Sequence, residues 1–175
     1  GPVDPLMLAA ETALLVDLES GEVLYEKNTE NPMKIASLVK IMTAVVALEH
    51  SDLQKNITVS AHAAAIGENT MGITEGEIYT LEELLYGLIL NSGNDAAYAI
   101  AEGVSGTSDK FVLWMNIKAN ELGLYNTFFA DPSGLDDSTR STAADLVRLS
   151  RYAMKNPDFR TIVKTNNVNL ISETH

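Results

Sequence analysis

An apolar stretch from residue 35 to residue 49 predicts a helix that is hydrophobic on nearly every side. A helix of this kind belongs in the middle of a domain rather than on its surface. Ser37 and Lys40 interrupt the apolar pattern at the start of this helix. Their spacing of three residues places both side chains on one helix face, with Cβ atoms roughly 5–6 Å apart.

Strand-like and helix-like patterns lie on both sides of this helix. Residues 12–18 and 23–28 predict two strands, joined into a β-hairpin by a turn at Gly21. Two more β-prone runs follow at 57–59 and 162–171. Between them lie a glycine-containing connection and helices predicted at residues 84–90, 96–102, 110–122 and 143–154. This order predicts an α+β fold, in which an antiparallel sheet carries a helical lobe.

Capping residues and glycines set the predicted helix boundaries. Thr80 and Glu83 have the spacing of a capping box, in which each side chain bonds the backbone N–H of the other residue. The remaining signals are Ser108-Asp109 at a helix start and Gly103, Gly123 and Asn156-Pro157 at helix ends.

The composition narrows the classes of function. The chain has 175 residues with 46% hydrophobic content, which fits one domain with a real core. The net charge of -12 and the lack of any basic run argue against nucleic-acid binding. There is no cysteine for disulfides, thiolate chemistry or zinc, and no apolar run reaches the ~18 residues of a membrane span. Residues 1–2 resemble the remnant of a removed purification tag, so we take residues 3–175 as the folding unit.

Ser37 and Lys40 together place a hydroxyl beside an amine, which is the arrangement of a nucleophile and its base. Two structural interpretations stay open, because Ser37 is a favoured N-cap residue and the Lys40 amine could extend to water. The N-cap interpretation lacks its usual partner, since a capping box has Glu or Gln three residues after the Ser. Burial and the positive end of the helix dipole both disfavour the charged amine. We therefore expect the pKa of Lys40 to lie below its free value of about 10.4.

Ser92-Gly93-Asn94 is a second candidate for a chemical role. It also fits a simple helix–helix connector, with Asn94 or Asp95 capping the next helix. A connector, however, does not need both a hydroxyl and an amide. The histidines do not suggest a metal: they are scattered, and no H-E-x-x-H motif is present, which argues against a zinc hydrolase. We expect no cofactor.

S-x-x-K followed by S-x-N resembles the motif set of the penicillin-recognising serine enzymes. The closer resemblance is to the low-molecular-mass D-alanyl-D-alanine carboxypeptidases, and it runs through most of the chain. The matching stretches lie within residues 36–44, 76–80, 84–88, 92–97, 111–123, 132–135 and 141–146. Several ordered matches outside the two motifs are more specific than either motif alone.

This resemblance implies a penicillin-binding fold and a role for each motif residue. Ser37 would be the acylated nucleophile and Lys40 the base that deprotonates it. Ser92 would shuttle the proton or support Lys40, and Asn94 would bind the substrate amide and help position Lys40. The Ser37 N–H, at the helix start, would serve as one oxyanion donor. The substrate would be a peptidoglycan stem peptide ending in D-Ala-D-Ala, β-lactams would acylate the same serine, and the location would be extracytoplasmic, near the cell wall.

One departure concerns the third motif of the family, K-T-G on a strand beside the site. Lys164-Thr165-Asn166 has Asn where Gly is needed and precedes the usual position, so we interpret it as coincidence. We therefore expect residues 3–175 to be the N-terminal part of the penicillin-binding domain, truncated on the C-terminal side of its sheet. A second chain carrying the K-T-G segment would then be a partner, or this part alone would be inactive.

Two other functions stay open on the sequence. A serine β-lactamase would differ by rapid deacylation, and no acidic residue of the second motif clearly supplies a base for that step. A non-catalytic module that keeps the fold would form no acyl adduct on Ser37.

Overall fold

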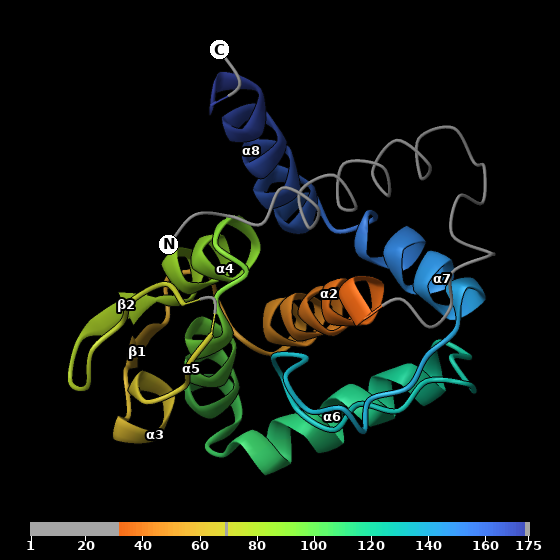
Figure 1. The fold of residues 1–175 in the computed structure, drawn as a ribbon, viewed down its shortest axis with the longest axis horizontal. Coiled ribbons are helices and arrows are strands. Elements are labelled where there is room, and N and C mark those ends of the chain that lie inside the picture. Colours follow the sequence, from red (N-terminus) through yellow and green to blue (C-terminus); the bar gives the residue numbers. More distant parts are fainter. Residues whose placement is uncertain (1–31, 69, 174–175) are drawn as a thin grey trace.

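The structure, a computed structural model, describes residues 32–68 and 70–173. Helix α2 (Pro32–His50) lies in the middle of this part of the chain, with the other long helices around it (Figure 1). These are α4 (Leu81–Leu90), α5 (Asn94–Ser105), α6 (Ser108–Glu121), α7 (Ala143–Ala153) and α8 (Pro157–Glu173). Each of them packs against α2. The predicted β-hairpin at 12–28 lies outside the described residues.

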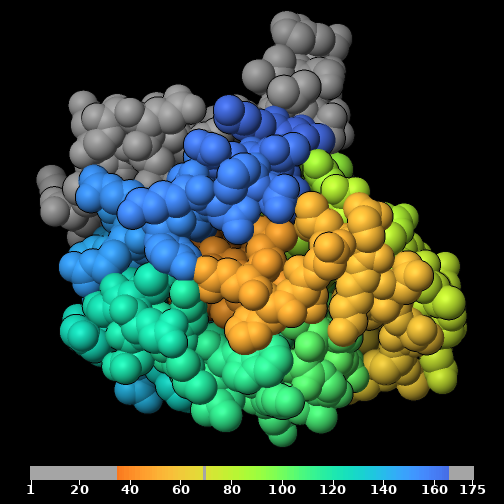
Figure 2. All heavy atoms as spheres, turned by 180° about the vertical axis from the view of Figure 1, so that it is seen from behind, coloured from red at the N-terminus to blue at the C-terminus, as the bar shows by residue number. Residues whose placement is uncertain are grey.

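The central place of α2 follows from its composition. Every residue from 37 to 47 is buried, and the large side chains of Leu38 and Met42 are 1% and 0% exposed. The C-terminal end of α2 and the residues after it reach the surface between the green and blue segments, as the view from behind shows (Figure 2). The prediction of a buried helix that is apolar on nearly every side is confirmed.

The start of α2 differs from the prediction, because the helix begins at Pro32. Pro is favoured at the first helical position, where its missing N–H is not needed. With 3.6 residues per turn, Ser37 lies in the second turn and Lys40 in the third. The interpretation of Ser37 as an N-cap is therefore wrong. The dipole argument for the pKa of Lys40 also fails, because that effect is largely confined to the first turn.

The described sheet is small. Strand β1 (Asn56–Thr58) pairs antiparallel with β2 (Ile78–Thr80), and Ile57 lies opposite Tyr79. This confirms a strand in the β-prone run at 57–59. The connection between the strands also contains the short helix α3 (Ala61–Ala64), in a stretch whose glycines predict only loop and turns. None of the helices within residues 32–68 and 70–173 has the length and apolar character needed to cross a membrane.

Thr80 and Glu83 form the predicted capping box at the start of α4. The Thr80 hydroxyl accepts a hydrogen bond from the Glu83 N–H at 3.1 Å, and the Glu83 carboxylate accepts one from the Thr80 N–H at 2.9 Å. These two bonds satisfy backbone donors that the helix itself cannot pair. They fix the start of the helix that leads into Ser92.

Thr80→Ala is expected to lower the free energy of unfolding by about 1 kcal/mol, because it removes the side chain that caps α4. Urea unfolding of the variant and the parent chain measures this difference. Glu75→Ala is a matched control, since Glu75 is exposed in the turn just before β2. Equal losses in the two variants would contradict the assignment of the cap.

Residues 162–171 belong to α8, so the prediction of a strand there is wrong. The Asn156 side chain accepts hydrogen bonds from the N–H groups of Asp158 and Phe159, at 2.9 and 3.2 Å, and Pro157 follows at the first helical position. Phe159 and Ile162, one turn apart, are only 4% and 3% exposed. A capped start and a buried helical face outweigh the β-preference of the branched side chains.

Two predicted helix boundaries also need correction. Helix α5 continues through Gly103 and ends at Ser105, where Gly106 follows as the C-cap with a φ of 99°. Gly103 is instead a packing position, because a Cβ there would lie 2.5 Å from the Ile57 side chain. Helix α6 is capped by Thr107, whose hydroxyl accepts from the Lys110 N–H at 3.1 Å, rather than by Ser108 and Asp109.

Candidate active site

Lys40 connects the two sequence motifs. Its Nζ donates a hydrogen bond to Asn94 Oδ1 at 3.3 Å, across a separation of 54 residues in the chain. It also donates to the Ser133 carbonyl oxygen at 3.0 Å. Lys40 and Asn94 are 3% and 4% exposed, so the amine is buried among polar partners. The interpretation in which Lys40 only extends to water is therefore wrong.

Ser37 lies one turn before Lys40 on the same face of α2 and is 4% exposed. The predicted pairing of a hydroxyl with an amine on one buried face is consistent with this placement. The unpaired N–H groups of a helix are those of its first turn. The Ser37 N–H, however, lies beyond the first turn of α2. The position of Ser37 in α2 therefore removes the helix-start argument for the Ser37 N–H as an oxyanion donor, and that role stays a prediction.

Ser92 occupies the connection between α4 and α5 in a strained backbone conformation, with a φ of 49°. A left-handed conformation costs a residue with a side chain about 1–2 kcal/mol. Ser92 is also 2% exposed, and its Oγ has no hydrogen-bond partner among the residues described. Leaving a buried hydroxyl unpaired costs about 1–3 kcal/mol more. Strain and an unpaired buried hydroxyl are features that concentrate at functional sites.

Asn94 begins α5, and both ends of its side-chain amide are bonded. Nδ2 donates to the Glu68 carbonyl oxygen at 3.0 Å, while Oδ1 accepts from Lys40. Because an amide has distinct donor and acceptor ends, the bond to Glu68 turns the Oδ1 end toward Lys40. The loop before residue 70 thus sets the orientation of a residue that contacts the candidate base.

Asp95 is a supporting residue that sequence reasoning treated only as a possible helix cap. Its carboxylate is 1% exposed. It accepts hydrogen bonds from the N–H groups of Met71, Gly72, Ile73 and Ala96, at 2.8, 3.0, 3.2 and 2.8 Å. The bond to Ala96 is a helix-start interaction, as an acidic residue in the first turn predicts. The other bonds fasten the loop at 71–73 to the start of α5, directly beside Asn94.

The loop at 131–134 docks on α2 through its backbone. The Thr43 hydroxyl donates to the Pro132 carbonyl at 2.7 Å, next to the bond between Lys40 and the Ser133 carbonyl. Gly134 has a φ of 94°, and a Cβ at this position would lie 3.1 Å from the Cα of Ala36. Only a residue without a side chain fits such a close approach in this conformation.

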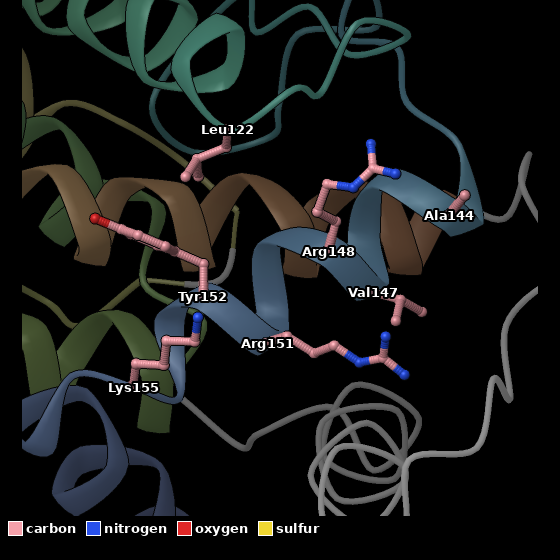
Figure 3. A pocket seen from close by; sticks show the side chains of 7 residues that line it. All are labelled: Leu122, Ala144, Val147, Arg148, Arg151, Tyr152 and Lys155. Carbon is pink, nitrogen blue, oxygen red and sulfur yellow. The ribbon is translucent and has the colours of Figure 1, made fainter.

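A cavity of about 420 Å³ lies elsewhere, along α7 (Figure 3). It is lined by Leu122, Ala144, Val147, Arg148, Arg151, Tyr152 and Lys155. The Arg148 side chain already has partners: its Nη1 donates to the Gly123 carbonyl oxygen at 2.8 Å and forms an ion pair with Asp145 Oδ1 at 3.7 Å. No candidate site residue lines this cavity, so it is not part of the site. Within the described ranges, no group of three or more acidic, histidine or cysteine side chains could hold a metal ion.

The fold belongs to the penicillin-binding class. The crystal structure of a D-alanyl-D-alanine carboxypeptidase from Mycobacterium tuberculosis is similar over 73% of this chain and 49% of that chain, with a TM-score of 0.70 and 42% identity. Penicillin binding protein 6B from Escherichia coli is similar over 73% and 44%, with a TM-score of 0.68 and 35% identity. These likenesses confirm the predicted fold class.

Within this class, the chain belongs to the D-alanyl-D-alanine carboxypeptidase family, whose sequence model matches residues 2–173. The carboxypeptidase DacF of Bacillus subtilis is 39% identical over 152 residues, which cover 83% of this chain and 39% of DacF. DacB2 of Mycobacterium tuberculosis is 40% identical over 156 residues, which cover 87% of this chain and 53% of DacB2. The chain thus spans about half the length, or less, of these relatives. The predicted family resemblance is confirmed.

Proposed function

We propose that this chain provides the nucleophile and the base of a serine D,D-carboxypeptidase, which removes the terminal D-Ala from peptidoglycan stem pentapeptides. The observation that carries this proposal is the buried bond from Lys40 Nζ to Asn94 Oδ1, because it joins the S-x-x-K and S-x-N segments in one place. Membership of the carboxypeptidase family supplies the reaction and the substrate class. Four residues take part: Ser37, Lys40, Ser92 and Asn94.

In the acylation step, the Ser37 hydroxyl attacks the carbonyl carbon of the penultimate D-Ala. The neutral Lys40 amine takes the hydroxyl proton as the new C–O bond forms. The tetrahedral intermediate then breaks its C–N bond, and the leaving D-Ala amine receives a proton. The products of this step are free D-Ala and a peptide esterified to Ser37.

Deacylation reverses the chemistry with water as the nucleophile. A base removes one proton from water, the hydroxide attacks the ester carbon, and the Ser37 oxygen leaves and recovers its proton. The shortened peptide is released. Dividing amide hydrolysis into two steps avoids the direct attack of water on a poorly reactive amide.

Ser92 and Asn94 complete the proposal. The Ser92 Oγ is buried and lacks a partner in the part of the chain described, so a hydroxyl is available to pass the proton toward the leaving amine. Asn94 holds the amine of Lys40 and would bond the substrate amide. Lys40 is held in place from two directions before substrate arrives, and such preorganisation lowers the cost of reaching the transition state.

β-Lactams would acylate Ser37 in the same way, because their strained amide takes the place of the D-Ala-D-Ala peptide bond. We further propose that residues 3–175 form the N-terminal part of the penicillin-binding domain and act together with a K-T-G strand. The protein would work outside the cytoplasm, where stem peptides of the cell wall are found.

Labelling with a fluorescent penicillin tests this proposal. The chain is labelled alone and with a polypeptide that carries the K-T-G strand of the family, and mass spectrometry locates the adduct. One adduct per chain on Ser37 is expected either for the chain alone or for the chain with the added polypeptide. Ser37→Ala should abolish it, while Ser138→Ala, at an exposed serine, should not.

The other outcomes separate the rival functions. Repeated turnover of penicillin by each chain would favour a serine β-lactamase, because that class deacylates rapidly. No adduct in either arrangement would contradict the proposal and favour a non-catalytic module that keeps the fold.

A further inference from the structure

The Lys40 amine donates to the Ser133 carbonyl as well as to Asn94, and the direction of this carbonyl depends wholly on the loop that carries it. A backbone oxygen has no rotamer of its own, so only the φ and ψ angles around it can turn it toward an amine. The neighbouring Pro132 carbonyl is also aimed at α2, where it accepts from Thr43. Something in the loop must therefore hold two successive carbonyl groups toward one helix.

The Asp131 carboxylate holds this conformation. It accepts hydrogen bonds from the Ser133 N–H at 3.3 Å, from the Gly134 N–H at 2.9 Å and from the Ser133 hydroxyl. Asp side chains commonly stabilise turns by bonding backbone groups two or three residues ahead. Asp131 is 4% exposed, so water competes little for these bonds. The carboxylate thus fixes the peptide units on both sides of the Ser133 Cα, and the second of these units contains the Ser133 carbonyl.

Tyr98 ties this carboxylate to α5. Its hydroxyl donates to Asp131 Oδ2 at 3.2 Å. Burial, and then the negative charge of Asp131, raise the pKa of Tyr98 above its ordinary value, so the phenol stays a donor. Tyr98 lies four residues after Asn94 and therefore on the same face of α5. One helix face thus holds Lys40 twice, directly through Asn94 and indirectly through Tyr98, Asp131 and the Ser133 carbonyl.

We propose that Asp131 and Tyr98 are positioning residues for Lys40, which act by aiming the Ser133 carbonyl at its amine. This inference rests on the proposed function in one respect, that Lys40 is the base for Ser37. The two residues touch neither substrate nor reacting atoms in this scheme. Their effect is transmitted through one backbone oxygen.

Lysine signals in the NMR spectrum test the positioning itself, without any need for activity. The chain is labelled with ¹³C-lysine, and the Lys40 Cε signal is assigned by its loss in Lys40→Met. Asp131→Ala and Tyr98→Phe are expected to shift this signal, with the smaller shift in Tyr98→Phe. In Asp131→Asn the Lys40 Cε chemical shift should lie closer to its value in the parent chain, because the amide oxygen still accepts from the Gly134 N–H. Asp137→Ala removes an exposed carboxylate from the same segment and should leave the signal unchanged.

Acylation by penicillin supplies the second readout. Asp131→Ala is expected to slow acylation about 10²-fold, which is the effect of a small misplacement of a catalytic group. Tyr98→Phe should slow it about tenfold, the equivalent of one hydrogen bond to a charged group at the lower end of its range. The dissociation constant of the complex formed before acylation should not change in either variant.

The two readouts separate this inference from the proposed function. If the parent chain is never acylated, the proposed function fails, and the Lys40 signal still decides the positioning. If Tyr98→Phe and Asp131→Ala unfold at the parent temperature but leave the Lys40 signal where Asp137→Ala leaves it, the positioning inference is overturned. A shift in both variants, with partial recovery in Asp131→Asn, supports it.

Discussion

Replacing Lys40 by Ala is expected to slow acylation of Ser37 about 10²–10⁴-fold, the contribution typical of a positioned general base. The reason is that no other described side chain bonds Asn94 Oδ1 and lies one turn from Ser37 on α2. The rate of labelling by a fluorescent penicillin, followed in a quenched-flow experiment, measures this change. Full labelling should still be reached at long times if only the base is lost.

Two further variants make the result specific. Lys40→Met keeps most of the side-chain volume without the amine, so it separates loss of the base from loss of packing. Lys55→Ala removes an exposed lysine and should acylate at the parent rate. Acylation of both Lys40 variants at the parent rate, with thermal unfolding unchanged, would show that Lys40 is not the base.

Asp95→Ala is expected to lower the free energy of unfolding by about 3 kcal/mol or more, since each buried donor left unpaired costs about 1–3 kcal/mol. The Ile73 and Ala96 N–H groups lie in buried residues and lose their acceptor, whereas water can reach the exposed Gly72. The loop at 71–73 would also detach from the start of α5. Urea unfolding, with comparison of the m-values, measures the loss.

Asp95→Asn and Asp109→Ala provide the comparison for this prediction. The Asn variant retains Oδ1, which accepts from Met71 and Ala96, so its loss should be roughly half as large. Asp109 lies in the first turn of α6 but is exposed, so its removal should cost only about 0.3–1 kcal/mol. Equal losses in Asp95→Ala and Asp109→Ala would show that the buried carboxylate does not anchor the loop.

The sequence was most informative about the site where function depends on side-chain type. Ser37, Lys40, Ser92 and Asn94 were proposed from their chemistry and their family resemblance. The bond between Lys40 and Asn94 shows that the fold brings two of these residues together. Their long separation in the chain means that no local pattern could predict this contact, and the family resemblance was needed to infer it.

The support around Lys40 could not be predicted in this way. The Ser133 contact uses a carbonyl oxygen, which every residue possesses, so the identity of residue 133 gives no signal. The turn residues at 131–134 predict a loop but not the helix on which the loop docks. Asp95 similarly has the residue type and the position of an ordinary helix cap. Its bonds to the loop at 71–73 depend on tertiary structure.

The predictions of a helix end at Gly103 and of a strand at 162–171 are wrong for a related reason. Gly103 predicts a helix end from its conformational freedom, but its place in α5 is decided by the close packing of Ile57. Residues 162–171 contain β-branched side chains, yet the cap at Asn156 and the burial of Ile162 place them in α8. A contact distant in sequence overrides the local preference of Gly103, whereas residues 162–171 are placed by a neighbouring cap together with tertiary burial.

The docking of residues 131–134 on α2 has a consequence for how this segment can change during evolution. Since the main-chain oxygen of Ser133 holds Lys40, a substitution of Ser133 that keeps the side-chain bonds to Asp131 and to the Leu135 N–H need not break that contact. Position 134 does not tolerate substitution in this way, because an added Cβ would lie 3.1 Å from the Cα of Ala36. Divergent relatives should therefore vary at the position of Ser133 only among small polar side chains that keep these bonds, and retain glycine immediately after it.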